Sequence, residues 1–446
     1  MQYHANVERG SPSMSQMESR HKKNAALLSI IPGLGQFYNR QSFKGIVFLA
    51  LFIIFAIEMI LTGFQALSGL ITLGSIPRDD HSLFLMIKGT LQLILFAIFL
   101  FFYVLNIVDA YKIGKLRDRG EKINTKTLDI LKNLWEQGFP YIFTFPSYIL
   151  MAFIIIFPVL VTLFIAFTNY DFQHIPPFKL IDWIGFENFT NIFFLSSYRA
   201  TFMKILVWTL IWTFGATTLQ IVIGVVAAVV LNQKHVKGKA FFRILFLLPW
   251  AVPAFISIMG FSNMFNDSIG AINAQVIPLI NHLPLIDIPA ISWKTDATWT
   301  KAALIMIQGW LGFPYIFVMV TGVLQSISDD LYEAANLDGA SAFQQFRSIT
   351  LPMILFATAP VMITQYTFNF NNFSIIYLFN EGGPGSIGWN AGSTDILISW
   401  IYKLTTGQAP QYAVAAAVTL IISVIVIAVS LITFKKTNAF GNEEMN

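Results

Sequence analysis

The chain has 446 residues, of which 55% are hydrophobic and only 12% are charged. Soluble domains carry charge on roughly a quarter of their residues, so this composition excludes an ordinary soluble protein and requires apolar surface that faces lipid. The aromatic content of 15% argues against intrinsic disorder, and the absence of cysteine excludes disulfides, thiolate metal sites, iron–sulfur clusters and thiol nucleophiles.

The chain begins with a polar segment, Met1 to Lys23, that lacks the hydrophobic region and cleavage site of a signal peptide. We expect a mobile tail here. The next stretch, residues 24–45, is apolar but short, and Pro32, Gly33 and Gly35 interrupt it. This pattern predicts an interfacial or re-entrant helix, with a ninth span as the alternative.

Eight stretches of about 20 apolar residues follow, which is the length that a helix needs to cross a bilayer. Their length and low charge favour helices over the short alternating segments of a membrane barrel. A buried helix of a soluble core is a plausible alternative for one stretch but not for eight. The sequence therefore predicts an all-α integral membrane protein, a polytopic bundle of about eight transmembrane helices near residues 45–62, 89–108, 148–168, 205–231, 244–263, 302–324, 353–379 and 412–434.

Only one of these stretches contains an acidic or basic residue, Glu58, near the outer end of the first span. An ionisable group inside a membrane suggests a proton or ion site by default. A hydrogen-bonded or interfacial carboxylate explains Glu58 equally well, and its role stays open.

The basic residues are concentrated in alternate segments between the spans. Residues 1–44 contain six Lys and Arg, residues 109–147 contain seven, and residues 232–243 contain four. Because cytoplasmic segments carry the excess of positive charge, this distribution predicts a multi-pass protein with both termini in the cytoplasm. The 325–351 loop contains a single basic residue, Arg347. Its cytoplasmic location is predicted only because successive loops must alternate between the two sides of the membrane.

Catalytic and metal-binding patterns are missing from the sequence. The six histidines are scattered without the spacing of a metal site, and no phosphate-binding G-x-x-x-x-G-K-[ST] loop occurs. We expect no catalytic residue, no metal, no cofactor, no nucleic-acid partner and no ATP hydrolysis by this chain itself. A membrane-embedded glycosyltransferase, one rival interpretation, would need an acidic or metal-binding set.

The loop between the sixth and seventh spans carries a specific motif. Residues Glu333–Pro352 read EAANLDGASAFQQFRSITLP and fit E-A-A-x3-G-x9-I-x-L-P at every fixed position. Ser328 predicts a helix start, because its hydroxyl can cap free N–H groups. Gly339 can adopt the left-handed conformation that ends one helix and turns the chain into the next. An ordinary helix-turn-helix between two spans is the alternative.

This motif resembles the EAA loop of ATP-binding-cassette (ABC) importer permeases, in which the loop is a coupling helix that docks into a cleft of the ATPase subunit. The resemblance implies that residues 325–352 form this coupling loop. It also implies ATPase-coupling roles for four residues, Glu333, Ala334, Ala335 and Gly339.

Three further runs are similar to the MalF-type permease of maltose and maltodextrin importers: GWLGFPYIF (309–317), FNFNNF (368–373) and NEGGPG (380–385). The resemblance covers most of the chain from about residue 144. It implies a MetI-like permease core of six helices at residues 144–440, after a tail (1–44) and two additional helices with a basic loop (45–143).

The same resemblance implies the partners: a second permease subunit of the MalG type, two ATP-binding subunits and an extracytoplasmic sugar-binding protein in a bacterial cell membrane. One departure concerns the second extracytoplasmic loop, about residues 169–200, which is short here and holds a large inserted domain in some members. We expect the 264–300 and 380–410 loops to help contact the binding protein.

Two constellations lie at membrane depth, and each has the spacing i, i+1, i+4 that gathers side chains on one helical face. The first is Leu311, Gly312 and Tyr315 in the sixth span, and the second is Phe368, Asn369 and Asn372 in the seventh. Amides and an aromatic plane suit a neutral sugar, which needs hydrogen bonds for its hydroxyls and a flat surface for its apolar face. These residues can instead only tie helices together, with Gly312 permitting close packing. In MalF-type permeases the matching positions contact the sugar, so the resemblance implies a sugar site at Leu311, Gly312, Tyr315, Phe368, Asn369 and Asn372.

The sequence therefore predicts the transmembrane permease subunit of an ABC importer for maltodextrin or maltose-type oligosaccharides. A permease for another sugar, such as a galacto-oligosaccharide or a raffinose-type sugar, is the alternative within the class. An ion-coupled secondary transporter is a further alternative, although it would show internal repeats and coupling-ion residues. The exact sugar and its chain length stay open.

Overall fold

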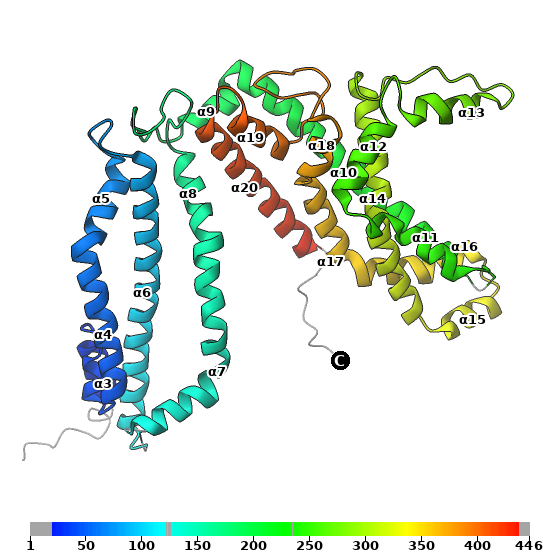
Figure 1. The fold of residues 1–446 in the computed structure, drawn as a ribbon. Coiled ribbons are helices and arrows are strands. Elements are labelled where there is room, and N and C mark those ends of the chain that lie inside the picture. Colours follow the sequence, from blue (N-terminus) through cyan, green and yellow to red (C-terminus); the bar gives the residue numbers. More distant parts are fainter. Residues whose placement is uncertain (1–19, 122, 124–125, 234, 437–446) are drawn as a thin grey trace, which may run out of the picture. The chain divides into compact units, whose positions relative to one another are not determined.

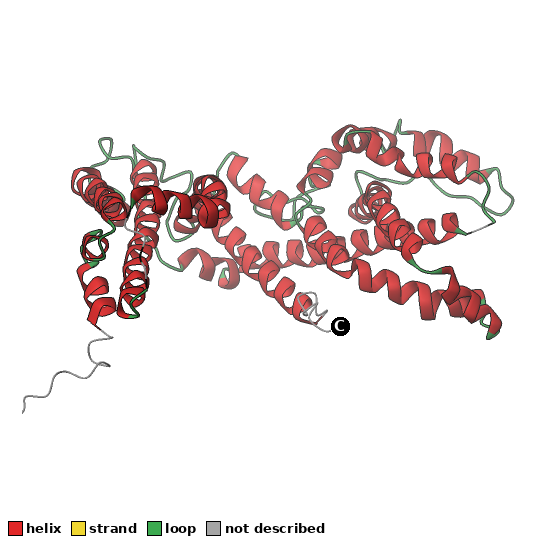
Figure 2. Ribbon diagram, turned by 90° about the horizontal axis from the view of Figure 1, so that it is seen from below, coloured by secondary structure: helices red, strands yellow, loops and turns green. Residues whose placement is uncertain are grey.

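The computed structural model describes residues 20–121, 123, 126–233 and 235–436, so most of the polar start of the chain lies outside the described residues. Helices joined by loops make up the described part of the chain, and no extended strand forms there (Figures 1 and 2). Among the described residues, seven helical segments are long and apolar enough to cross a membrane, and an eighth span is formed if one bent pair of helices counts as a single span. The predicted all-α bundle of about eight spans is confirmed.

Contacts divide the chain into two compact units, which are described separately. The first unit contains the residues up to 164 and residues 173–183. Its helices are α2 (Arg20–Leu28), α3 (Leu34–Tyr38), α4 (Ser42–Glu58), the π-helix η1 (Met59–Gly63), α5 (Phe64–Thr72), α6 (Ser82–Asp118), α7 (Thr127–Met151), the π-helix η2 (Ala152–Ile156) and α8 (Phe157–Ile165), whose last residue belongs to the second unit.

The interrupted stretch at residues 24–45 forms α2, α3 and the start of α4. Helix α2 has nine residues and α3 has five, and both are too short to span a membrane. The structure therefore does not form a ninth span from this stretch. The Asp118 carboxylate at the end of α6 accepts hydrogen bonds from the backbone N–H groups of His21 and Lys22, at 2.9 and 3.1 Å. These bonds satisfy free donors in the first turn of α2 and hold it against α6.

Gly33 makes the sharp turn between α2 and α3. Its φ is +91°, and a Cβ atom there would lie 2.3 Å from the carbonyl oxygen of Gly45. The Asn106 side chain of α6 fixes the same turn, because it accepts from the Gly33 N–H at 3.0 Å and donates to the Ser29 carbonyl at 2.8 Å. The position of this hairpin relative to the membrane stays a prediction.

The second unit contains residues 165–172 and the chain from residue 184 onward. Its helices are α9 (Glu187–Phe194), α10 (Ser196–Asn232), α11 (Lys239–Ala251), α12 (Ala254–Met264), η3 (Ile272–Val276), α13 (Ile277–Asn281), α14 (Ala297–Ser326), α15 (Asp329–Leu337), α16 (Ala342–Gln345), η4 (Phe346–Thr350), α17 (Leu351–Phe370), α18 (Phe373–Asn380), α19 (Leu397–Thr406) and α20 (Tyr412–Lys436).

The span predicted at residues 244–263 is not a straight helix. It consists of α11 and α12, whose axes differ by 91°, with a break at Val252 and Pro253. Proline lacks the N–H that would continue the helix and disfavours the helical conformation of the residue before it. Val252 accordingly has an extended backbone.

The α10–α14 pair forms the centre of the second unit. Gly224 on α10 allows close approach, because a Cβ atom there would lie 2.5 Å from the Cβ of Ile316 and 2.9 Å from the carbonyl oxygen of Phe313. Small residues at helix contacts let backbones pack tightly inside a membrane, where little hydrophobic force drives helices together. The helix pair therefore depends on the absence of a side chain at this position.

We predict that Gly224→Ala destabilises the protein by about 1–3 kcal/mol, because the added methyl group overlaps α14. Gly322→Ala on α14 is the matched control, since nothing lies within 4 Å of its Cβ position. Alanine is the better helix former, so the control should be neutral or slightly stabilising. Thermal unfolding of the detergent-purified variants measures both effects, and equal midpoints would contradict the packing argument.

Candidate functional site

Six polar side chains from α10, α14 and the α17–α18 junction form a hydrogen-bonded group, which we call the amide cluster: Thr217, Gln220, Gln308, Gln365, Asn369 and Asn372. Gln220 lies at its centre. The Oε1 atom of Gln220 accepts from Asn369 Nδ2 and from Gln308 Nε2, both at 3.3 Å, and its Nε2 donates to Gln365 Oε1 at 3.2 Å. One fully buried amide thus joins three helices.

The remaining bonds of the amide cluster fix the end of α17. Asn369 Nδ2 also donates to Thr217 Oγ1 at 2.9 Å, and Asn372 Nδ2 donates to Gln308 Oε1 at 3.2 Å. The indole N–H of Trp212 donates to the backbone carbonyl of Asn369 at 2.8 Å, and the same carbonyl accepts from the Asn372 N–H at 3.2 Å, so both bonds fix the helix end. Buried polar groups in an apolar bundle need such partners, so the amide cluster holds α10, α14 and α17 in one arrangement.

The helix that carries the second constellation ends inside it. Helix α17 stops at Phe370 and α18 starts at Phe373, with Asn372 in a non-helical conformation (φ −78°, ψ 78°). Phe368 and Asn369 consequently have different surroundings: the Phe368 side chain is 60% exposed, whereas Asn369 is completely buried. The i, i+1, i+4 spacing does not place these residues on one continuous helical face.

Phe368 lines an open groove of about 530 Å³ between α17 and α20. The polar groups beside its ring are two threonine hydroxyls, one amide and the hydroxyl of a serine on α20; the lining residues are Ile363, Thr364, Thr367, Phe368, Asn371 and Ser430. The groove lining carries no charged side chain. An aromatic face beside neutral hydrogen-bonding groups can bind a neutral polyhydroxyl compound.

The first constellation lies on α14. Gly312 packs directly on Gln220, and a Cβ atom there would lie 2.0 Å from Gln220 Oε1. Gly312 therefore leaves the space that the central amide occupies, as the helix-packing alternative requires. Leu311 is half-buried beside an apolar core formed by α10, α12, α14 and α18, and the ring of Tyr315 is 5.8 Å from that of Trp250 on α11.

The 325–352 loop forms the predicted helix-turn-helix. Ser328 caps α15 by accepting from the Asp330 N–H at 3.3 Å, and Gly339 has a left-handed backbone with φ +76°. Ser341 and Gln344 form a capping box at the start of α16. Gln345 Nε2 donates to Asn336 Oδ1 at 2.6 Å and ties the two short helices together. Both local predictions from the sequence, the Ser328 cap and the left-handed Gly339, are confirmed.

The outer side of this loop is exposed. Glu333 and Ala334 are accessible, Ala335 is half-buried, and the Leu337 side chain is 90% exposed.

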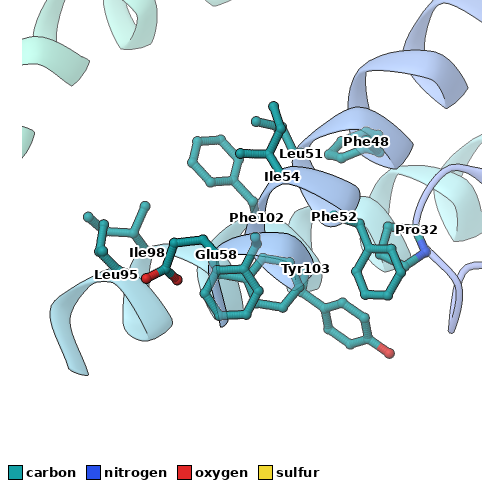
Figure 3. A pocket seen from close by; sticks show the side chains of 12 residues that line it. Pro32, Phe48, Leu51, Phe52, Ile54, Glu58, Leu95, Ile98, Phe102 and Tyr103 are labelled. Atoms are coloured by element: carbon teal, nitrogen blue, oxygen red, sulfur yellow. The ribbon is translucent and has the colours of Figure 1, made fainter. Parts of the chain in front are cut away.

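Glu58 lies in the first unit, in an apolar groove between α4 and α6 (Figure 3). Its Oε2 atom accepts from Gln92 Nε2 at 2.9 Å, and its Oε1 atom accepts from Thr62 Oγ1 at 2.8 Å. Both carboxylate oxygens thus have hydrogen-bond partners. This agrees with the interpretation of Glu58 as a hydrogen-bonded carboxylate, the alternative to a proton or ion site.

The extracytoplasmic loop predicted at 380–410 contains a buried ion pair. Asp395 is almost completely inaccessible and accepts from Lys403 Nζ at 2.5 Å, from Ser399 Oγ at 2.8 Å and from the Gly392 N–H at 2.6 Å. Burial raises the pKa of the Asp395 carboxyl group, while these three donors oppose the shift. Two of the donors, Ser399 and Lys403, lie on α19, so these bonds attach the loop to that helix.

Four members of the amide cluster were not among the predicted site residues: Thr217, Gln220, Gln308 and Gln365. The available signal was an amide inside an apolar stretch, since Gln220 and Gln308 each interrupt a predicted span. The sequence could not show that Gln220 bonds both Gln308 and Asn369, because these contacts join residues 88 and 149 positions apart.

Residues 220–437 match the family described as binding-protein-dependent transport system inner membrane component. The maltodextrin transport system permease protein MdxF of Bacillus subtilis (strain 168) is 68% identical over 96% of this chain and 98% of its own length. The galactooligosaccharides transport system permease protein GanP of the same organism is 49% identical over 95% of this chain and 100% of its own length. A solved bacterial ABC transporter involved in the import of the acidic polysaccharide alginate shares the fold with a TM-score of 0.56 at 19% identity, covering 70% of this chain and 100% of that chain. The chain therefore belongs to the binding-protein-dependent transport system inner membrane component family, the permeases of ABC importers.

Proposed function

We propose that this permease moves maltodextrin or maltose-type oligosaccharides into the cytoplasm. The observation that carries the proposal is the uncharged groove beside Phe368, which combines an aromatic face with hydroxyl and amide groups. The 68% identity to a maltodextrin permease over almost the whole chain supports it. A galacto-oligosaccharide is the second candidate substrate, because a permease named for that sugar class is 49% identical over a similar length.

The proposed importer contains a second permease of the MalG type, two ATP-binding subunits and an extracytoplasmic sugar-binding protein. ATP hydrolysis then takes place in the partner subunits and not in this chain. The Lys and Arg distribution supports an orientation with both termini in the cytoplasm. In this orientation the 325–352 loop faces the ATP-binding subunits, and the 264–300 and 380–410 loops face the binding protein.

The proposed sugar contacts are Leu311, Gly312, Tyr315, Phe368, Asn369 and Asn372. The exposure of the Phe368 ring and the partial exposure of the Asn372 amide support direct contact of these two side chains with a sugar. Asn369 and Gly312 both contact Gln220, so in this conformation they position the accessible residues. They reach the sugar only when the amide cluster rearranges during the change from one access state to the other.

The proposed coupling surface is the exposed side of α15 and the turn after it. Glu333, Ala334, Ala335 and Gly339 place this short helix at the ATPase, and Gly339 sets the direction in which the chain leaves it. Closure of the ATP-binding subunits would move α15, and α16 and η4, which continue along the chain into α17, would carry this movement to the helix that bears Phe368 and Asn369.

Substrate identity is tested by reconstitution. The complete importer in proteoliposomes, with its binding protein and internal ATP, should accumulate labelled maltotriose. Galacto-oligosaccharide uptake that exceeds maltotriose uptake would favour the second candidate. Uptake of neither sugar, with ATP hydrolysis intact, would contradict the proposal.

We predict that Phe368→Ala raises the KM for maltodextrin uptake by roughly 2- to 12-fold, because aromatic contacts contribute about 0.5–1.5 kcal/mol. Asn372→Ala should raise the KM by a similar factor through the loss of a hydrogen bond. Phe356→Ala is the matched control, since this phenylalanine of the same helix is 88% exposed and lies outside the groove. Uptake per assembled complex is the measurement. Identical KM values for all three variants would exclude the site.

We predict that Gly339→Val uncouples ATP hydrolysis from transport or weakens ATPase recruitment. The left-handed backbone disfavours a β-branched side chain by about 1–2 kcal/mol, although space for the side chain is free. Gly339→Asn is the control, because asparagine tolerates this conformation. Binding-protein-stimulated ATP hydrolysis and uptake are measured together. Equal coupling in the valine and asparagine variants would show that this turn does not transmit the movement.

A further inference from the structure

A long trough runs between α4 and α6 in the first unit, outside the proposed sugar site. It consists of two grooves of about 420 and 230 Å³ that share Phe48, Leu51 and Phe102. On α6 the lining residues recur every three or four positions from Leu95 to Lys112, so they form one stripe on that helix. We call this feature the α4–α6 trough.

The two ends of the α4–α6 trough differ in polarity. The larger groove has Lys44, Asp109 and Lys112 at one end. Beyond them the lining is aliphatic and aromatic except for Glu58, whose carboxylate accepts hydrogen bonds from Gln92 and Thr62. Figure 3 shows Phe48, Phe52 and Phe102 beside the apolar space of this neighbouring groove. A charged end that continues into an apolar channel matches an amphiphile and does not match a sugar.

The charge at the polar end favours an anion. Lys44 Nζ lies 2.6 Å from Asp109 Oδ1, and Gln36 Nε2 donates to Asp109 Oδ2 at 3.4 Å, so the one carboxylate among the described lining residues of the larger groove already has a cation and a donor. The Lys112 side chain is exposed, and its amino group has no hydrogen bond or ion pair to another described residue. The residues that line the polar end thus carry one positive charge in excess.

The dimensions match one leaflet of a bilayer. From Leu95 to Lys112 the stripe on α6 rises about 25 Å at 1.5 Å per residue. Half of a bilayer, including its headgroup region, is about 20 Å thick. The side chains of Val47, Leu51 and Leu105 are partly exposed along this length, which leaves apolar surface for acyl chains.

We propose that the α4–α6 trough binds a phospholipid with an anionic headgroup. Lys112 contacts the phosphate, the Lys44–Asp109 pair contacts the rest of the headgroup, and an acyl chain lies along Leu51, Phe102 and Leu105. Basic pockets between transmembrane helices at the cytoplasmic side are a recurring way to hold anionic lipids. Only the assignment to the cytoplasmic leaflet rests on the proposed orientation; binding itself is independent of the proposed sugar.

The test measures lipid binding to the complete detergent-purified importer by native mass spectrometry, with added phosphatidylglycerol or phosphatidylcholine of identical acyl chains. Phosphatidylglycerol should bind more tightly. Lys112→Gln should weaken its binding about fivefold, the effect of one basic residue near a membrane surface. Lys115→Gln, which removes an exposed charge outside the trough, should change it less than twofold.

Two further variants separate charge from shape. Val108→Trp should fill the trough and abolish phosphatidylglycerol binding without changing the charge, and Lys112→Arg should preserve binding. Equal binding of the two lipids, or equal effects of Lys112→Gln and Lys115→Gln, would overturn the proposal. Full competition by glycerol phosphate would also overturn it, because it would indicate a site for a soluble anion. Lipid binding that the isolated chain shows and the complete importer lacks would overturn it too, because it would assign the trough to a partner subunit. None of these outcomes depends on which sugar is transported.

Discussion

The arrangement of the second unit depends on one constraint: amide groups buried among apolar helices must satisfy one another. Gln220 meets this constraint by accepting from Gln308 and Asn369 and donating to Gln365. An unpaired amide in such surroundings costs about 1–3 kcal/mol, so any movement of α10, α14 or α17 must break and remake these bonds together. Gly312 belongs to the same constraint, since only glycine leaves room for the Gln220 side chain.

This constraint connects the proposed sugar site to the proposed coupling loop. The amide cluster fixes the end of α17, where Phe368 and Asn372 reach the accessible surface, and the other end of α17 follows η4 and α16 of the coupling loop. The chain between the two sites is a nearly unbroken helical segment, counted as one candidate span from Ala342 to Asn380. A displacement of the coupling loop can therefore move the end of α17 at the proposed sugar site directly along the helix, without a long chain of side-chain contacts.

Local sequence rules predicted part of this structure correctly. Hydrophobic stretches of sufficient length located the spans, and Ser328 and Gly339 form the predicted cap and left-handed turn because both depend on neighbouring residues only. The 91° break at Pro253 was missed because average hydrophobicity does not register a bend, although the proline was visible. The different surroundings of Phe368 and Asn369 were missed because the end of α17 is fixed by Trp212 and Thr217, which are distant in sequence.

The claim that a sugar contacts the α17–α18 junction is tested most directly by thiol protection, because the natural chain contains no cysteine. Single variants Phe368→Cys, Asn372→Cys and Phe356→Cys are introduced into the assembled importer, and their rates of reaction with a polar maleimide are measured with and without maltodextrin under turnover. The account predicts that the sugar slows modification at positions 368 and 372 and leaves position 356 unchanged. Modification rates at positions 368 and 372 that do not respond to sugar, in an importer that transports it, would contradict the account.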